Sequence, residues 1–254
     1  MRSIFSPHGE RALTSIMDSR TLLAFDFDGT LAPIVPRPED ARSPTSISRA
    51  MSQLAKVAPI AIITGRAIAD VRGRLNFEPK YIVGNHGAEG VPGQSEREQD
   101  RSDVAGWEKQ ILAGWDTLPQ GVQLENKQYS LSLHYRMAAN REEARQALER
   151  LLMPLQPAPR MIGGKGLINL MPADAADKFD ALIALQKTEG AKHVLFVGDD
   201  ETDEAVFSKA LPDWLTIRIG QKDDSAALYY LNSQSEMATL IQRLERVIRT
   251  KPSR

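Results

Sequence analysis

The chain of 254 residues contains no cysteine. Disulfide bonds, thiolate metal sites and cysteine nucleophiles are therefore excluded. No apolar run approaches the length of a membrane-spanning helix, and the N-terminal segment lacks the apolar core of a signal peptide. The formal net charge is only −1, which gives no reason to expect a nucleic acid or an anionic membrane as a partner. We expect a cytoplasmic, monomeric protein.

What the sequence does contain is a set of short apolar runs that alternate with helical patterns. The runs are almost continuously apolar, which is typical of strands buried on both faces of a parallel sheet. Strands that alternate with helices predict right-handed crossover units and an α/β fold, with a Rossmann-like, doubly wound parallel sheet. The predicted strands cover residues 21–27, 59–65, 81–87, 193–199 and 214–220, and the predicted helices include 46–58, 174–190 and 236–250.

The middle of the chain, residues 94–171, has a different pattern and predicts an inserted α+β cap domain. Residues 123–136 alternate polar and apolar side chains in their second half, as in a strand with one face in water. Residues 1–93 and 172–254 then form the core domain. Within the insertion we expect a helix at 102–118, the strand at 123–136, a helix at 140–155, a glycine-rich turn at 163–166 and a strand at 167–171.

Carboxylates gather where the predicted core strands end. In open α/β sheets, ligands bind beyond the carboxyl ends of the strands, so these side chains should converge. Such a cluster cannot stay ionised without a cation, and oxygen ligands suit Mg²⁺ held together with a substrate phosphate. The residues at these ends are Asp26 and Asp28 after the first strand, Thr64 after the second, and Asp199, Asp200 and Asp203 after the strand at 193–199.

Two plainer interpretations compete with a metal site. An EF-hand calcium loop fails, because an apolar residue separates Asp26 from Asp28 and no glutamate follows at the required spacing. Helix N-caps are the second interpretation, since Asp and Thr often begin helices. Capping could explain Thr64 or Asp203 alone, but it does not explain paired aspartates at two different strand ends.

The same residues resemble the haloacid dehalogenase-like phosphotransferases. "DFDGT" at residues 26–30 is similar to their first motif, Thr64 in "IITGR" to their second, Lys178 to their third and "GDDETD" at 198–203 to their fourth. Any one of these motifs is weak, but their order along an alternating fold is specific.

This resemblance implies a role for each motif residue. Asp26 would be the nucleophile that forms an aspartyl-phosphate, and Asp28 would be the general acid and base. Thr64 would hydrogen-bond a phosphoryl oxygen, and Lys178 would offset negative charge. Lys178 could instead be a solvated surface lysine, and Lys165 is a second candidate for the third motif.

The resemblance also implies a metal site. Asp199 would ligate Mg²⁺ together with Asp26 and the main-chain carbonyl of Asp28. Asp200 and Asp203 would either ligate the ion themselves or hold the residues that ligate it.

Two further segments resemble trehalose-6-phosphate phosphatases and imply a disaccharide phosphate as the substrate. They are residues 84–89, "GNHGAE", and residues 124–136, "LENKQYSLSLHYR". Charged side chains there could hydrogen-bond sugar hydroxyls, although each could equally lie on a wet strand face or in a turn. The implied substrate-binding residues are Gly65, Arg66, Asn85, His86, Glu89, Glu125, Lys127, His134, Arg136 and Asn169.

The sequence departs from the family pattern at two positions. Asn169 stands where the family usually has an acidic residue, and Phe179 follows Lys178 where glycine is usual. These departures leave the phosphatase chemistry intact and leave the sugar open. The alternatives are a phosphatase for another glycosyl phosphate, such as glucosyl- or mannosyl-glycerate phosphate, a sugar phosphomutase, and a sugar-binding module without activity.

Overall fold

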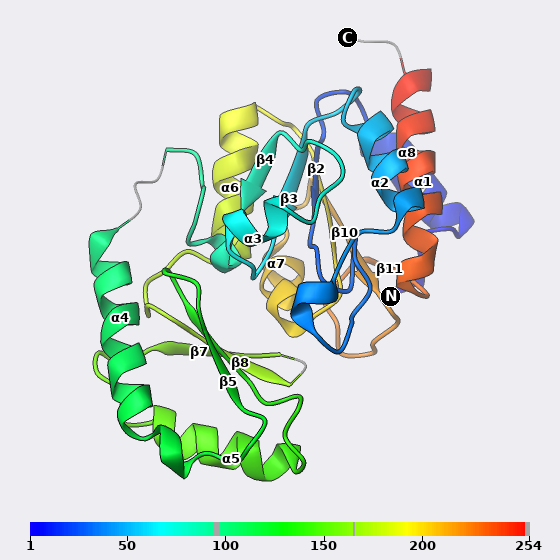
Figure 1. Cartoon of the computed structure of the whole chain (residues 1–254). Helices are drawn as coiled ribbons and strands as arrows, with labels where there is room; N and C mark the ends of the chain where they lie inside the picture. The colour runs from blue at the N-terminus through cyan, green and yellow to red at the C-terminus, as the bar shows by residue number, and fades with distance from the viewer. Residues whose placement is uncertain (94–96, 165, 252–254) are drawn as a thin grey trace. The chain divides into compact units, whose positions relative to one another are not determined.

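The computed structural model describes residues 1–93, 97–164 and 166–251 of the chain. The chain forms two compact units, drawn in Figure 1. Unit 1 joins Met1–Gly93 to Ala176–Arg254, and unit 2 is the inserted segment Gln94–Ala175. The predicted start of the insertion, residue 94, lies outside the described residues. A function of unit 2 as a lid stays a prediction.

Unit 1 is built on a parallel sheet of seven strands in the order β1-β11-β10-β9-β2-β3-β4, which confirms the predicted fold class. All five predicted strands are present, and each ends one to four residues earlier than predicted. β1 and β11 were not predicted, because two or three residues are too few for a hydrophobic pattern. The strands are β1 (Arg2–Ser3), β2 (Leu22–Phe25), β3 (Ile60–Ile63), β4 (Tyr81–Val83), β9 (Val194–Gly198), β10 (Trp214–Ile219) and β11 (Tyr229–Leu231).

Both faces of this sheet are covered, as the continuously apolar strands predicted. Successive side chains of a strand point to opposite faces, so Leu23 and Phe25 of β2 join one apolar cluster and Leu22 and Ala24 join the other. All four side chains are fully buried. The first cluster packs α1 (Pro7–Ile16), α2 (Thr45–Leu54), α3 (Ile68–Arg72) and α8 (Met237–Thr250) on the sheet, and the second packs α6 (Lys178–Glu189) and α7 (Glu204–Lys209) (Figure 1).

The start of α6 differs from the prediction and matters for the site. A helix beginning at residue 174 was wrong, because a capping box sets its first residue at Lys178. The Asp177 carboxylate accepts from the Asp180 N–H at 2.9 Å, and the Asp180 carboxylate accepts from the Asp177 N–H at 3.0 Å. The helix ends at Glu189 and is capped by Gly190, which has a φ of 63°. No helix in the described part of the chain is long and apolar enough to cross a bilayer.

Unit 2 has an antiparallel sheet in the order β5-β6-β8-β7, backed by two helices. The predicted single strand at 123–136 was wrong: it is a hairpin that reverses at residues 127–130, where Gln128 has a φ of 70°. β7 was not predicted and includes part of the expected glycine turn. The elements are α4 (Glu98–Ala113), β5 (Gln123–Asn126), β6 (Leu131–His134), α5 (Arg141–Leu152), β7 (Arg160–Gly164) and β8 (Leu167–Met171).

Burial at the centre of the large sheet should dominate the stability of unit 1. Leu195 on β9 is fully buried, and Leu228 is 53% exposed. We expect Leu195→Ala to lower the free energy of unfolding by about 2–5 kcal/mol, because it leaves a cavity in a packed core. The matched change Leu228→Ala should stay within about 0.5 kcal/mol of the parent in urea unfolding. Equal losses in the two variants would contradict this assignment of the core.

Candidate active site

The carboxyl ends of three neighbouring strands bring the predicted side chains together. Asp26 follows β2, Thr64 follows β3 and Asp199 follows β9, and all three are at most 5% exposed. Hydrogen bonds continue the sheet at two of these positions. The Asp26 N–H donates to the Val197 carbonyl and the Thr64 N–H donates to the Val83 carbonyl, each at 2.9 Å. The backbone therefore fixes where the Asp26 and Thr64 side chains begin.

Lys178 joins this group from the first residue of α6. Its Nζ lies 2.8 Å from Asp26 Oδ1 and 2.7 Å from Asp203 Oδ1. The residue is only 2% exposed, so it is no surface lysine. Burial alone would lower the pKa of Lys178, but the carboxylates of Asp203 and Asp26 outweigh it and raise the pKa. The pairing with two carboxylates therefore favours the charged ammonium form of Lys178 beside Asp26. The alternative candidate, Lys165, lies outside the described residues.

Asp203 holds the turn that follows β9. Its Oδ2 accepts from the main-chain N–H of Asp199 at 2.8 Å and of Asp200 at 2.9 Å, while its Oδ1 accepts from Lys178. A Cβ on Gly198 would lie 2.4 Å from the Asp203 carboxyl carbon, so only glycine fits there. Both oxygens of Asp203 are thus engaged, and Oδ2 holds the main chain at Asp199 in place. Asp200 caps the next turn, with its Oδ1 accepting from the Glu201 N–H at 2.8 Å.

Among the described residues, Asp26, Asp199 and Asp203 form a group that could bind a metal ion, with carboxylate oxygens within 4.8 Å of one another. Burial raises the pKa of Asp26 well above its usual range, and Asp203 and Asp199 add to this despite Lys178. Such a set of oxygen donors suits a hard cation, whose charge would favour the ionised carboxylates. Asp28 and Asp200 are outside this group, and their role at a metal stays a prediction.

Gly29 makes room for the Asp199 carboxylate. It has a φ of +84°, and a Cβ there would lie 2.1 Å from Asp199 Oδ2. Glycine is therefore required at this position both for its backbone conformation and for space. The glycine of the "DFDGT" segment thus brings the turn after β2 against the turn after β9.

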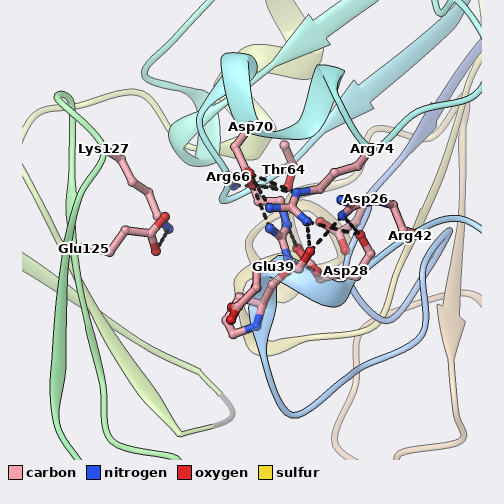
Figure 2. A network of polar contacts seen from close by, with 12 residues as sticks. Asp26, Asp28, Glu39, Arg42, Thr64, Arg66, Asp70, Arg74, Glu125 and Lys127 are labelled. Atoms are coloured by element: carbon pink, nitrogen blue, oxygen red, sulfur yellow. Dashed lines mark hydrogen bonds and ion pairs between the residues drawn. The ribbon is translucent and has the colours of Figure 1, made fainter.

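Asp28 is held by Arg66, as Figure 2 shows. Arg66 Nε lies 2.6 Å from Asp28 Oδ2, and Arg66 Nη2 lies 2.7 Å from Asp28 Oδ1. The same guanidinium donates to Asp70 Oδ2 at 2.7 Å and to the Pro38 carbonyl at 2.9 Å. Arg66 is therefore engaged with the protein, and substrate binding by it stays a prediction.

The segment 84–89 forms a tight turn beside the end of β3. Asn85 and His86 have φ values of 49° and 56°, in the left-handed region. Glu89 Oε2 accepts from the Ile68 N–H and from Asn85 Nδ2, both at 2.9 Å, which ties the turn to the start of α3. A Cβ on Gly65 would lie 2.4 Å from the His86 ring. These contacts give Gly65, Asn85 and Glu89 a structural role, and their binding of substrate stays a prediction.

In unit 2, most of the predicted sugar-binding residues share the polar face of the antiparallel sheet. Cross-strand register places Glu125 opposite Ser132, and Ser132 opposite Asn169. Ser132 Oγ and Asn169 Oδ1 are 2.5 Å apart. The other face carries the leucines and isoleucine that pack on α4 and α5. Alternation along β6 therefore sorts polar from apolar residues, as expected for this strand.

Two more predicted residues accompany Glu125 on this face. Its Oε2 lies 2.9 Å from His134 Nε2 and 3.7 Å from Lys127 Nζ, the contact drawn in Figure 2. Arg136 lies in the turn after β6, where its main-chain carbonyl accepts from Arg141 Nε at 3.1 Å and its Cβ lies beside Gly166.

Three polar residues with a place in these networks were not predicted. Ser132 was not predicted because it lies among the polar residues of an alternating strand, where serine is common. Asp70 and Arg74 follow Arg66 at intervals of four residues, which is the spacing of neighbours on one helix face. That spacing was the available signal, but charged residues at such intervals are common on helix surfaces.

A parallel sheet with carboxylates and a buried lysine at one edge, interrupted by an α+β insertion, is a fold found in the haloacid dehalogenase superfamily. The structure of a sugar phosphatase of subclass IIB of that superfamily has a similar fold: the TM-score is 0.57 at 18% identity, covering 90% of this chain and all of that chain. The C-terminal domain of the trehalose-6-phosphate phosphatase of Candida albicans is also similar, with a TM-score of 0.78 at 20% identity over 97% of this chain and 98% of that one.

More specifically, the chain belongs to the trehalose-phosphatase family. The family model, described as trehalose-phosphatase, matches residues 24–235. The trehalose-phosphate phosphatase of Mycobacterium tuberculosis is 31% identical over 244 residues, which cover 91% of this chain and 62% of that protein. The chain thus spans less than two thirds of the length of this curated relative.

The buried ion pairs of Lys178 should contribute much of the stability at this edge of the sheet. We expect Lys178→Met to lower the free energy of unfolding by about 3–5 kcal/mol in metal-free buffer, because two buried carboxylates lose their cation. Lys209 is a matched control: it pairs with Asp177 at 2.9 Å, but its side chain is 51% exposed. Lys209→Met should cost about 1 kcal/mol or less. Urea unfolding measures both, and a small loss for Lys178→Met would show that the buried pair is dispensable.

Proposed function

We propose that the protein is a Mg²⁺-dependent phosphatase that hydrolyses trehalose 6-phosphate to trehalose and phosphate, a reaction of trehalose biosynthesis. The observation that carries this proposal is the placement of Asp26, with Lys178 Nζ on its Oδ1 at 2.8 Å and Asp199 within the same acidic group. Family membership supports trehalose 6-phosphate as the ester. We further propose that the protein acts in the cytoplasm as a monomer.

The proposed chemistry has two steps. In the first, an oxygen of the Asp26 carboxylate attacks phosphorus, the bond from phosphorus to the sugar oxygen breaks, and Asp28 gives its proton to the departing sugar. In the second, Asp28 takes a proton from water, whose oxygen attacks the aspartyl-phosphate and releases phosphate. Asp26 and Asp28 are then restored, so the reaction is a net hydrolysis.

Lys178 and Thr64 act on charge and position in both steps. The ammonium of Lys178 is fixed by two carboxylates, so it needs no reorganisation to stabilise negative charge beside Asp26. The hydroxyl of Thr64, at the end of the neighbouring strand, would donate to a phosphoryl oxygen. Both groups act before and after the phosphoryl group is transferred.

Asp26 and Asp199 are the residues that would hold Mg²⁺, together with the Asp28 main-chain carbonyl. Asp203 lies in the same group, but its two oxygens already accept from Lys178 and from two main-chain N–H groups, so we assign it to support. When bound, Mg²⁺ supplies positive charge that neutralises the phosphoryl oxygens.

The polar face of unit 2 offers donors and acceptors for the sugar. Glu125, Lys127, His134, Arg136 and Asn169 would serve here, because charged groups form strong hydrogen bonds with hydroxyls. Asn169 is neutral and already accepts from Ser132. This neutral position is the observation that favours a second candidate, a phosphatase for another glycosyl phosphate such as glucosyl- or mannosyl-glycerate phosphate. A phosphomutase or a binding module without activity finds no comparable support.

A substrate panel tests the proposal. We expect phosphate release in Mg²⁺ to be fastest, as kcat/KM, with trehalose 6-phosphate among glucose 6-phosphate, glucosylglycerate phosphate, mannosylglycerate phosphate and an aryl phosphate. Asp26→Asn, which keeps the shape of the side chain but removes the nucleophilic carboxylate, should abolish turnover while the circular dichroism spectrum stays unchanged. Preference for another glycosyl phosphate would contradict trehalose 6-phosphate as the substrate. Full activity of Asp26→Asn would exclude Asp26 as the nucleophile.

Metal dependence gives a second test. A chelator should silence turnover and added Mg²⁺ should restore it. Mg²⁺ should also raise the melting temperature, since a ligand at a hundred times its dissociation constant stabilises a protein by about 2.7 kcal/mol. Asp199→Asn should lose this thermal shift, and the matched change at exposed Asp223, Asp223→Asn, should keep it. Activity in excess chelator, or an unchanged shift in Asp199→Asn, would contradict the metal assignment.

A further inference from the structure

Four charged side chains form one connected network that begins at Asp28 (Figure 2). Arg66 donates to both oxygens of Asp28, at 2.6 and 2.7 Å, and to Asp70 Oδ2 at 2.7 Å. Arg74 Nε lies 2.9 and 3.0 Å from the two oxygens of Asp70, and Arg74 Nη2 also donates to this carboxylate. Two cations and two anions therefore alternate from Asp28 to Arg74.

The two arginines are the more buried members of the network. Their side chains are 11% and 10% exposed, whereas those of Asp28 and Asp70 are 35% and 34% exposed. Arg66 Cζ also lies 5.7 Å from the centroid of the Phe27 ring. A buried guanidinium needs most of its N–H groups satisfied, and Arg66 makes four hydrogen bonds to Asp28, Asp70 and the Pro38 carbonyl.

The far end of the network is anchored to the backbone. Arg74 Nη1 donates to the carbonyls of Glu39 at 2.7 Å and Ala41 at 3.3 Å, in the loop that follows β2. Asp70 belongs to α3, Arg66 and Arg74 lie just before and just after this helix, and both arginines donate to the Asp70 carboxylate, which brings the three side chains together. Asp70 is thus paired with two arginines. Main-chain carbonyls hold Arg74 in place, and Arg66 is bound to Asp28.

We propose that Asp70 is a positioning residue for the acid–base carboxylate Asp28, and that it acts through Arg66. The inference rests on the proposed phosphatase function. The Arg66 fork sets the plane of the Asp28 carboxylate, because two parallel N–H donors fix both of its oxygens. Asp70 in turn sets the direction of the fork through Nη1. Asp70 touches neither the phosphoryl group nor the nucleophile in this scheme.

The leaving group reports on this role. A sugar or phenol oxygen leaves well only if a proton reaches it as its bond to phosphorus breaks, and the proton comes from Asp28. A strongly acidic phenol leaves as its anion and needs no proton. Loss of Asp70 should therefore slow esters with poor leaving groups and spare esters with good ones. Damage to the fold, to Asp26 or to Lys178 would slow both kinds equally.

The experiment measures kcat/KM for a series of aryl phosphates, from phenyl to dinitrophenyl phosphate, together with trehalose 6-phosphate. This parameter covers the steps up to departure of the leaving group, so later hydrolysis of the aspartyl-phosphate does not enter. For Asp70→Asn we expect about a tenfold to a hundredfold loss with phenyl phosphate and with the sugar ester. With dinitrophenyl phosphate the loss should be about threefold or less.

Two further variants sharpen the result. Arg66→Lys keeps the positive charge and removes the fork, so it should show the same dependence on the leaving group as Asp70→Asn. Glu245→Gln is the matched control, because Glu245 pairs with Arg249 Nε at 2.9 Å and the same spacing of four residues on α8. It should leave the whole series unchanged. Circular dichroism and thermal unfolding confirm that each variant is folded.

The outcomes separate this inference from the proposed function. Equal losses across the series for Asp70→Asn, or no loss at all, would overturn the positioning role while wild-type activity stands. Absence of activity on sugar phosphates with normal activity on aryl phosphates would overturn the proposed substrate, and the aryl series would still decide the role of Asp70. Absence of any phosphatase activity in the wild type would overturn both.

Discussion

The interaction on which the rest of the site depends is the buried cation of Lys178 between Asp26 and Asp203. Taking each of these charges out of water costs several kcal/mol, and only close pairing offsets that cost. Asp203 is held in turn by the N–H groups of Asp199 and Asp200. One ammonium group therefore joins the end of β2 to the turn after β9. This link sets the distances between the carboxylates at the two strand ends.

Much of the site could be predicted, because parallel strands end at a common edge. Asp26, Thr64 and Asp199 needed only the strand pattern, whereas Lys178 needed the family resemblance, since nothing local distinguishes it from a surface lysine. The contribution of Asp203 to the turn was not predictable in detail, because it depends on hydrogen bonds to main-chain groups. Asp70 and Arg74 were missed because their spacing of four residues from Arg66 is common on helix surfaces, and because the loop carbonyls that bind Arg74 are distant in the sequence.

The fold was predicted best where burial on both faces made the strands continuously apolar. Errors fell where local hydrogen bonding decides the structure. The capping box at Asp177 starts α6 later than hydrophobic periodicity suggests. In unit 2, the polar and apolar alternation of residues 123–136 gave no sign of the reversal at 127–130, and the glycines of β7 resembled a turn. All three errors reflect competition between pattern and turn chemistry.

The strand order has a consequence for how the protein is made. β2 lies between β3 and β9, and Leu22 pairs with Val194, on the far side of the inserted unit 2 in the sequence. On the ribosome, β2 therefore keeps one open backbone edge until unit 2 has been synthesised, and Asp26 has no ammonium partner until Lys178 emerges. Open strand edges favour association between chains. The nascent chain thus passes through a period in which Asp26 is present but the side chains that surround it are not, and the emergence of α6 and β9 ends that period.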